Sequence, residues 1–463
     1  MVNAPDPDFS RIRSVVDRLV RVGRLLAPDQ RRPDGGLKND IMQAQLHLIV
    51  EAFGAENVGG FAGSDDPEAD DWYLCHSGRV FLPSREAAGS VEEYFSRRSG
   101  EYAGVGELRD EGPDLLVYEF PSRRDEAEHD LHLVLDEMEE IYGEGVATPD
   151  HIVYVTPNGG GHLCPASEPQ VTGSIDPVPG RTANARAGAG VRVSVVDTGW
   201  YLGSSTSEAT PWLSKAEGSP HIEGDEEHVD LSHIHPYAGH GTFAAGIIRC
   251  LAPQVALEIE GVLTQAGAVF ESEIVKELEE ALADRDLPDV ISIQAGAYTR
   301  GDRGLVILEK FLARIRRVEG REPPLVIAAA GNNSTDRPFF PAAYEWVVGV
   351  GATNDDASLC DFTNYGPWVN VYAHGRELIN AFPIGTYTCY EPPNAGEVRT
   401  FTTGLAEWSG TSFSTPVVTG AVAAYMSEHG CSAREAVAAL IKNGLPLSDP
   451  KAKGKVAVGP PYV

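Results

Sequence analysis

The sequence predicts an α/β protein, and three observations support that prediction. Residues 191–196 alternate valines with polar residues before a final valine pair, residues 289–293 are mostly apolar, and both stretches are typical of buried strands. Residues 239–247 and 410–424 each begin with a glycine and continue in small residues, as helices packed closely on a sheet do. Strands and helices of these kinds predict a sheet with helices packed against it.

A smaller α+β module is expected ahead of this sheet. Strands are predicted over residues 79–82, 102–108, 115–120 and 152–155, and helices over residues 86–98 and 131–141. The order β-α-β-β-α-β is the ferredoxin-like plan. Further upstream, apolar residues at helical spacing predict helices over residues 9–26 and 41–53, followed by a glycine-rich, acidic loop over 54–72.

The length of 463 residues is too great for one typical domain. We therefore divide the chain into a helical N-terminal extension of unknown role (1–75), a ferredoxin-like module (76–164) and a larger α/β domain (165–463). Residues 157–161, which are rich in glycine, mark the flexible connection between the last two.

Composition excludes several classes of partner. With 37 basic and 68 acidic residues the net charge is −31, which argues against binding to nucleic acid or to an anionic membrane. The sequence contains no run of eighteen apolar residues, so no membrane span is predicted. The N-terminus has neither a basic start nor an apolar core, so we expect no secretory signal and a cytoplasmic location.

A metal site is not expected either. The six cysteines lack the spacing of zinc ligands. His228, His233 and His235 follow the acidic run 223–227 and could in principle form a metal cluster. Nothing in the sequence makes these residues converge, so we expect a solvated loop.

Ser412 lies in the turn Gly410–Pro416, which leads into the small-residue helix. Pro416 is expected in the first helical turn, where a missing N–H costs nothing. A serine at such a helix start lies among unpaired N–H groups and the positive end of the helix dipole, where an oxyanion is stabilised. Taken alone, Ser412 could equally be a helix cap.

Three further residues lie at comparable positions. Asp197 ends the strand 191–196, at the carboxyl end where open α/β sheets place their sites. His240 lies between two glycines at the start of a helix, and Asn332 follows an apolar strand and Gly331. Two of them have a structural alternative when taken alone, because Asp197 could form a turn and His240 could be a core or capping residue.

Together, the order Asp197, His240, Ser412 and the local sequences around them resemble those of the subtilisin-like serine peptidases. The resemblance implies a doubly wound, mostly parallel sheet with helices on both faces. It implies an Asp197–His240–Ser412 triad, an oxyanion hole that includes Asn332, and no cofactor. Many relatives insert a calcium-binding loop after the histidine helix, and its absence here means that no metal is expected at that place.

The resemblance also assigns a substrate-binding segment. Gln294, Ala295 and Gly296 follow the strand 289–293 and match the family segment whose backbone pairs with a peptide or protein substrate as an added strand. This segment forms one wall of the primary specificity pocket in the family. Gln294 stands where relatives usually carry a serine.

Relatives commonly carry a prodomain of the β-α-β-β-α-β plan, which aids folding and inhibits the peptidase. By this resemblance, residues 76–164 are a prodomain-like module that binds the peptidase in cis, and an unrelated small domain is the alternative. The family's cut would fall near Cys164–Pro165, where Pro165 is expected to slow cleavage, so that residues 157–166 stay in the cleft.

The sequence therefore predicts a subtilisin-like serine endopeptidase held in check by its N-terminal module. Two alternatives remain open: a maturation protease dedicated to one partner protein, and a catalytically silent peptidase fold that serves as a binding module. A panel of unfolded proteins separates the first alternative from general proteolysis, because a dedicated enzyme leaves most of them intact.

Overall fold

A computed structural model describes residues 39–61, 71–112, 115–125, 130–155, 168–214, 222–263, 266–281, 287–317, 322–391 and 393–462. The helix predicted over residues 9–26, the connection 157–161 and the cleft segment 157–166 lie outside these residues.

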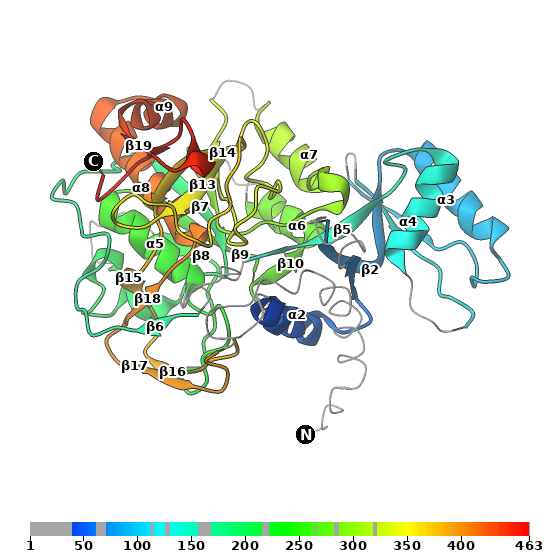
Figure 1. The fold of residues 1–463 in the computed structure, drawn as a ribbon, viewed down its shortest axis with the longest axis horizontal. Helices are drawn as coiled ribbons and strands as arrows, with labels where there is room; N and C mark the ends of the chain where they lie inside the picture. Colours follow the sequence, from blue (N-terminus) through cyan, green and yellow to red (C-terminus); the bar gives the residue numbers. More distant parts are fainter. Residues whose placement is uncertain are drawn as a thin grey trace.

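A nine-stranded sheet forms the centre of the larger domain (Figure 1). Its strand order is β19-β20-β14-β13-β12-β11-β7-β9-β8, and all neighbours are parallel except β19 and β20. The mostly parallel sheet predicted from the sequence is confirmed. Its strands are β7 (Arg192–Asp197), β8 (Ile222–Gly224), β9 (Ala256–Gly261), β11 (Val290–Ile293), β12 (Leu325–Ala329), β13 (Val348–Thr353), β14 (Val369–His374), β19 (Leu445–Pro446) and β20 (Val456–Ala457).

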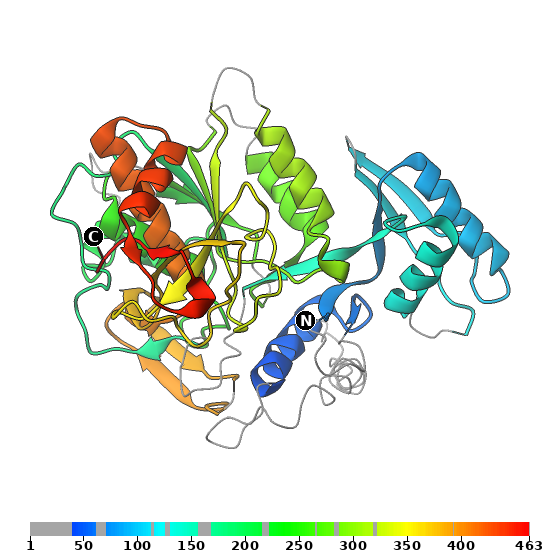
Figure 2. The same cartoon turned by 45° about the horizontal axis from the view of Figure 1, so that its top comes forward.

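Helices cover both faces of this sheet (Figure 2). Val193 and Val195 of β7 pack into one apolar cluster with α5, α8 and α9. Val196, Ile291 and Ile293 point to the opposite face and pack with α6 and α7. Because side chains of a strand alternate between faces, the central strands β7, β11 and β12 contribute to both clusters. The helices are α5 (His240–Leu251), α6 (Glu271–Ala281), α7 (Val306–Ile315), α8 (Thr411–His429) and α9 (Ala433–Asn443).

The sequence predicted Pro416 in the first turn of its helix, but Pro416 lies further along it. Helix α8 begins at Thr411, so that Pro416 is its sixth residue. The prediction was wrong because the turn residues 411–414 are themselves helical. Since a helical N–H normally bonds the carbonyl four residues earlier, Pro416 leaves the Ser412 carbonyl without that partner.

The N-terminal module has the element order that the sequence predicted. Its elements are β2 (Tyr73–Leu82), α3 (Arg85–Arg97), β3 (Glu107–Gly112), β4 (Leu115–Glu119), α4 (Leu131–Tyr142) and β5 (Thr148–Tyr154). The strands pair antiparallel in the order β5-β2-β4-β3, and α3 and α4 share one apolar cluster with β2 and β4. One boundary differs, because the strand expected over 102–108 begins only at Glu107. Tyr102 instead packs its ring 4.8 Å from that of Phe95.

The segment before the module includes a helix and a strand. Helix α2 (Asn39–Phe53) agrees with the helix predicted over 41–53. Residues 58–61, expected in a loop, form strand β1 (Val58–Phe61), which pairs antiparallel with β2. Gly60 has a φ of +152°, and a Cβ there would collide with the Tyr73 carbonyl, so the close approach of the two strands requires glycine. Glycine in a strand weakens the sequence signal, which explains why β1 was missed.

Small β elements surround the large sheet. Strands β15 (Leu378–Ala381), β18 (Leu405–Trp408) and β6 (Gln170–Val171) form one antiparallel sheet. Strands β16 (Gly385–Thr388) and β17 (Val398–Phe401) form a two-stranded antiparallel sheet. None of the described helices combines the length and apolar character needed to cross a bilayer.

Strand β5 connects the module to the larger domain. It runs from the module towards α6, where β10 (Ala268–Phe270) pairs with it antiparallel (Figure 1). The module's sheet therefore extends to β10-β5-β2-β4-β3, with β1 attached to β2. A strand of the larger domain is thus part of the module's sheet.

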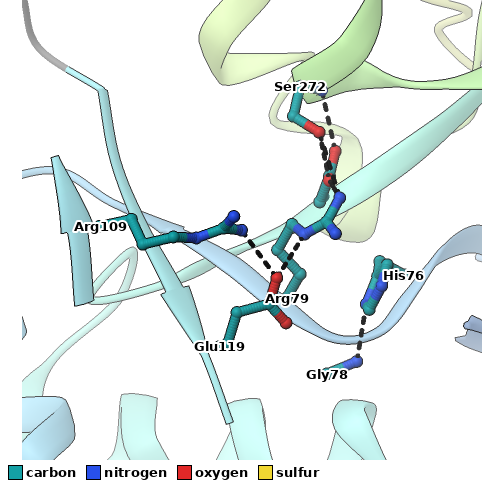
Figure 3. Close-up of polar contacts among 7 residues, drawn as sticks. His76, Gly78, Arg79, Arg109, Glu119 and Ser272 are labelled. Atoms are coloured by element: carbon teal, nitrogen blue, oxygen red, sulfur yellow. Dashed lines mark hydrogen bonds and ion pairs between the residues drawn. The ribbon is translucent and has the colours of Figure 1, made fainter. Parts of the chain in front are cut away.

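Polar contacts that include Arg79, Glu119, Arg109 and Ser272 reinforce this junction (Figure 3). Asp150 of β5 accepts hydrogen bonds from the Ser272 N–H (3.1 Å) and hydroxyl (2.7 Å) at the start of α6. Arg79 lies 3.2 Å from Asp150 and 2.8 Å from Glu119, on which Arg109 also converges. Burial raises the pKa of Asp150 to about 6, although the Ser272 bonds and the charge of Arg79 oppose the rise.

Candidate active site

Asp197 and His240 form a buried hydrogen-bonded pair. Asp197 is the last residue of β7 and His240 the first of α5, and both are fully buried. The His240 Nδ1 lies 2.7 Å and 2.9 Å from the two carboxylate oxygens. The Thr198 N–H donates to Asp197 Oδ1 at 2.7 Å and helps to fix the carboxylate. With Nδ1 committed to Asp197, Nε2 is the nitrogen left to exchange a proton.

Ser412 lies close to this pair but its hydroxyl points elsewhere. It is the second residue of α8, and its Oγ donates to the Gln294 carbonyl at 2.9 Å. The next residue, Phe413, has its ring centroid 4.8 Å from that of His240. The Ser412 hydroxyl is therefore bonded to Gln294 rather than to His240 in this structure. Catalytic hydrogen bonds often become aligned only in the substrate complex.

The Asn332 amide is oriented by the residue before Ser412. Its Oδ1 accepts from the Thr411 N–H (2.9 Å) and from the Thr411 hydroxyl (2.8 Å). Nδ2 lies on the side of Gly410, where a Cβ would come within 3.4 Å of it. Because the oxygen end is occupied, the NH₂ end is the one suited to donate to an oxyanion at Ser412.

The Gln294 side chain points into the protein interior. Its amide lies 2.7 Å from the Ser292 hydroxyl, which in turn lies 2.9 Å from that of Thr419 on α8. The polar interior therefore accommodates glutamine at a position where the family usually has serine. Only the backbone carbonyl of Gln294 faces Ser412.

Gly296, two residues further on, pairs with the end of β5. The Tyr154 N–H donates to the Gly296 carbonyl at 2.9 Å, and the Gly296 N–H donates back at 3.1 Å. On the other side, the Val155 N–H donates to the Gly267 carbonyl at 2.8 Å. The end of β5 thus lies between Gly267 and Gly296. The chain's own strand therefore pairs with Gly296, and this pairing begins before the segment 157–166, which was expected to occupy the cleft.

Helix α2 packs beside the same strand end. Gln45 is buried, and its Nε2 donates to the Val155 carbonyl at 2.6 Å. Phe53 places its ring 4.9 Å from that of Phe270 on β10. Ile49 belongs to the same apolar cluster as Val155. The sequence revealed the apolar face of this helix but not what it packs against.

The loop histidines do not converge on a metal site. Within the described ranges, no three or more histidine, cysteine, aspartate or glutamate side chains are grouped to hold an ion. His235 Nδ1 lies 3.1 Å from the Pro236 carbonyl, and His233 Nε2 lies 3.3 Å from the Tyr390 hydroxyl.

Comparison with known proteins identifies relatives of the larger domain. An intracellular serine protease of Paenibacillus polymyxa is 28% identical over 292 residues, which cover 58% of this chain and 79% of the relative. Subtilisin DY of Bacillus licheniformis is 27% identical over 260 residues, 53% of this chain and 80% of the relative. Among solved structures, the patellamide maturation protease PatA overlaps 59% of this chain and 95% of its own, at 22% identity and a TM-score of only 0.44.

A model of the subtilase family, Peptidase_S8, matches residues 188–455. The matched region is more than half of the chain and contains Asp197, His240, Asn332 and Ser412. The chain belongs to the subtilase family and is a subtilisin-like serine endopeptidase.

Proposed function

We propose that the chain cleaves peptide bonds through Asp197, His240 and Ser412. The observation that carries this proposal is the buried 2.7 Å contact between Asp197 and His240, with Ser412 on the adjacent helix start. Ser412 Oγ attacks the scissile carbonyl carbon while His240 Nε2 takes its proton. His240 then gives that proton to the leaving amine, and a water molecule releases the acyl group from Ser412 by the same steps in reverse order.

Asp197 and Asn332 support this reaction without forming bonds to the substrate carbon. Asp197 keeps the imidazole oriented through Nδ1 and stabilises the imidazolium that forms. The Asn332 NH₂ group and the Ser412 backbone N–H donate to the oxyanion. The Ser412 N–H is in the first turn of α8, where backbone donors have no partner within the helix.

A fluorophosphonate label tests the nucleophile. The reagent should modify the wild-type protein at Ser412, as located by peptide mass spectrometry, and should leave Ser412→Ala unmodified. Labelling of both proteins at another residue would contradict the assignment.

Asn332→Ala should lower turnover by about 10²–10³-fold, the usual cost of removing one oxyanion donor. Asn332→Asp keeps an oxygen for Thr411 but replaces the donor by a negatively charged oxygen, so a loss at least as large is expected from it. The control is Asn333→Ala. Asn333 is the adjacent residue, but its side-chain oxygen accepts from the Tyr298 hydroxyl, so its loss should not affect the oxyanion donor. Turnover is measured for each variant, and thermal melting of the same samples checks that the variant is folded. Normal turnover of both Asn332 variants would show that the donor lies elsewhere.

We also propose that the N-terminal ferredoxin-like module is a prodomain-like inhibitor that acts in cis. A bound peptide would pair with Gly296 as an added strand. The end of β5 already makes those backbone bonds, so β5 must leave before a substrate can bind. Helix α2 gives the N-terminal extension a part in this inhibition, because Gln45 bonds the carbonyl of Val155.

Charge complementarity supports the docking of the module. Arg300, which lies beyond β11, is ion-paired with Asp136 and, at 2.8 Å, with Glu139 on α4. Arg303 is ion-paired with Glu139 and, at 2.9 Å, with Glu144. Partial burial would raise the pKa of Glu139, but bonds from Arg303, the Gly145 N–H and Arg300 lower it to about 2. Glu139 therefore stays ionised at neutral pH, and its attraction to the two arginines persists.

A further inference from the structure

Glu227 lies beside Asp197 and His240, although its acidic run predicts a solvated loop. It follows β8, and it is buried while the preceding residues 223–226 are exposed. Its Oε2 accepts a hydrogen bond from the Gly239 N–H at 2.9 Å. Gly239 is the residue before His240 and has a φ of +79°. It stands at the N-cap of α5, and as a glycine it has no side chain to cap that helix. Glu227 thus holds the backbone directly before the histidine.

The same loop is bonded to the segment that follows Asp197. The Glu227 N–H donates to the Trp200 carbonyl at 3.0 Å, and the Trp200 N–H donates to the Asp225 carbonyl at 2.8 Å. At Gly199 a Cβ would lie 3.2 Å from the Glu227 Cβ, so the two segments are in close contact. Glu227 therefore links the end of β7 to the start of α5.

Two other bonds join these segments, but they act on the opposite side of His240. The Gly241 N–H donates to the Thr198 hydroxyl at 3.1 Å, and the Tyr201 N–H donates to the Thr242 hydroxyl at 2.8 Å. These contacts fix the first turn of α5 after the histidine. The Glu227 carboxyl fixes the chain before it.

We propose that Glu227 is a positioning residue for His240, which it holds in register with Asp197 through Gly239. The proposal rests on the proposed catalytic triad. A 2.7 Å contact between side chains at the ends of two different elements tolerates little displacement of either backbone. Removing the Glu227 carboxyl lets the residue before His240 shift, and small misplacements of catalytic groups are costly.

The carboxyl has an unusual protonation equilibrium that provides a readout. Burial raises the pKa of Glu227 to about 8, and the negative charge of Asp197 raises it further, while the Gly239 N–H and the Thr198 hydroxyl oppose the rise. At neutral pH the group is mostly protonated, and its carbonyl oxygen can still accept from Gly239. Above pH 8 a second negative charge develops beside Asp197.

The test compares Glu227→Ala and Glu227→Gln in the full chain. Glu226→Ala is the matched control, because Glu226 is the neighbouring residue and its side chain is about half exposed. The first readout is the rate of fluorophosphonate labelling of Ser412. We expect Glu227→Ala to lower it by about 10- to 100-fold. Glu227→Gln keeps an oxygen for the Gly239 N–H and should stay within about threefold of wild type.

The second readout is the low-field NMR signal of the proton between His240 Nδ1 and Asp197, which requires no open cleft. In wild type its position should change in a step near pH 8, where Glu227 titrates, and in Glu227→Gln this step should be absent. A step that persists in Glu227→Gln, or wild-type labelling of Glu227→Ala, overturns the proposal. If Ser412→Ala is still labelled, the triad itself is wrong, and that result is distinguishable from a failure at Glu227.

Discussion

Ser412→Ala and His240→Ala are each expected to remove nearly all peptidase activity, and the double variant should be hardly worse than either. Ser412 supplies the nucleophile and His240 its base, so neither residue contributes to turnover without the other. Losses of about 10⁶-fold are typical when one member of such a unit is removed. Initial rates on a peptide substrate, with fluorophosphonate labelling of the same samples, measure the effect.

Ser414 provides a matched control for this experiment. It is buried in the same helix two residues further on, and its hydroxyl has no hydrogen-bond partner among the described residues. Ser414→Ala removes the same kind of atom from the same buried helix and should retain labelling at Ser412. Clearly additive losses in the Ser412/His240 double variant would count against a triad that acts as one unit.

The positions of the main site residues could be predicted because their signals are local. Asp197 ends a strand of valines, and Asn332 follows one that is wholly apolar. The parallel sheet places the carboxyl ends of β7, β11 and β12 at one edge, which brings Asp197, Gln294 and Asn332 together. His240 and Ser412 begin helices that pack on the same face of that sheet. Chain order and local sequence were therefore sufficient to place these residues at strand ends and helix starts, and their catalytic roles are the proposal made above.

Contacts between distant segments left no such signal. Gln45 meets the Val155 carbonyl across 110 residues of sequence, and nothing in the apolar periodicity of α2 specifies that partner. Glu227 belongs to an acidic run in which its neighbours are exposed as expected. Only the tertiary structure distinguishes Glu227 from these neighbours, because its burial depends on contact with the segment after Asp197. Tyr154 likewise resembles any other strand residue until it is seen paired with Gly296.

Reversing a charge at the docking surface is expected to activate the full-length protein. Arg300 is buried on the larger domain and pairs with Glu139 of the module. Arg300→Glu replaces attraction by repulsion at α4, and breaking a buried ion pair in this way costs about 3–5 kcal/mol. If docking of β5 blocks the cleft, that cost shifts the equilibrium towards the open form by about 100-fold or more. The labelling rate of Ser412 should rise accordingly.

Two further variants separate this effect from general destabilisation. Arg314→Glu reverses a charge on α7 whose partner, Glu279, lies on α6 of the same domain, so it should leave the labelling rate unchanged. Glu139→Arg alone should activate as Arg300→Glu does, because it also places like charges together. Combining the two reversals restores the opposite-charge pair between positions 300 and 139 but leaves like charges facing Asp136 and Arg303. The double variant should therefore be labelled more slowly than either single variant, as expected of residues in contact.

The same proteins report whether the module remains attached. We expect wild type to lose its N-terminal module only slowly, or by a cut displaced a few residues from Cys164–Pro165, and Ser412→Ala to keep its full intact mass, because β5 is held by Gly296, Gly267 and α2. Rapid loss of the first 164 residues from wild type alone would refute slow cleavage.

If Arg300→Glu and Glu139→Arg are folded but labelled at the wild-type rate, docking through this surface does not restrain the enzyme. The pairing of β5 with Gly296 would then require another explanation.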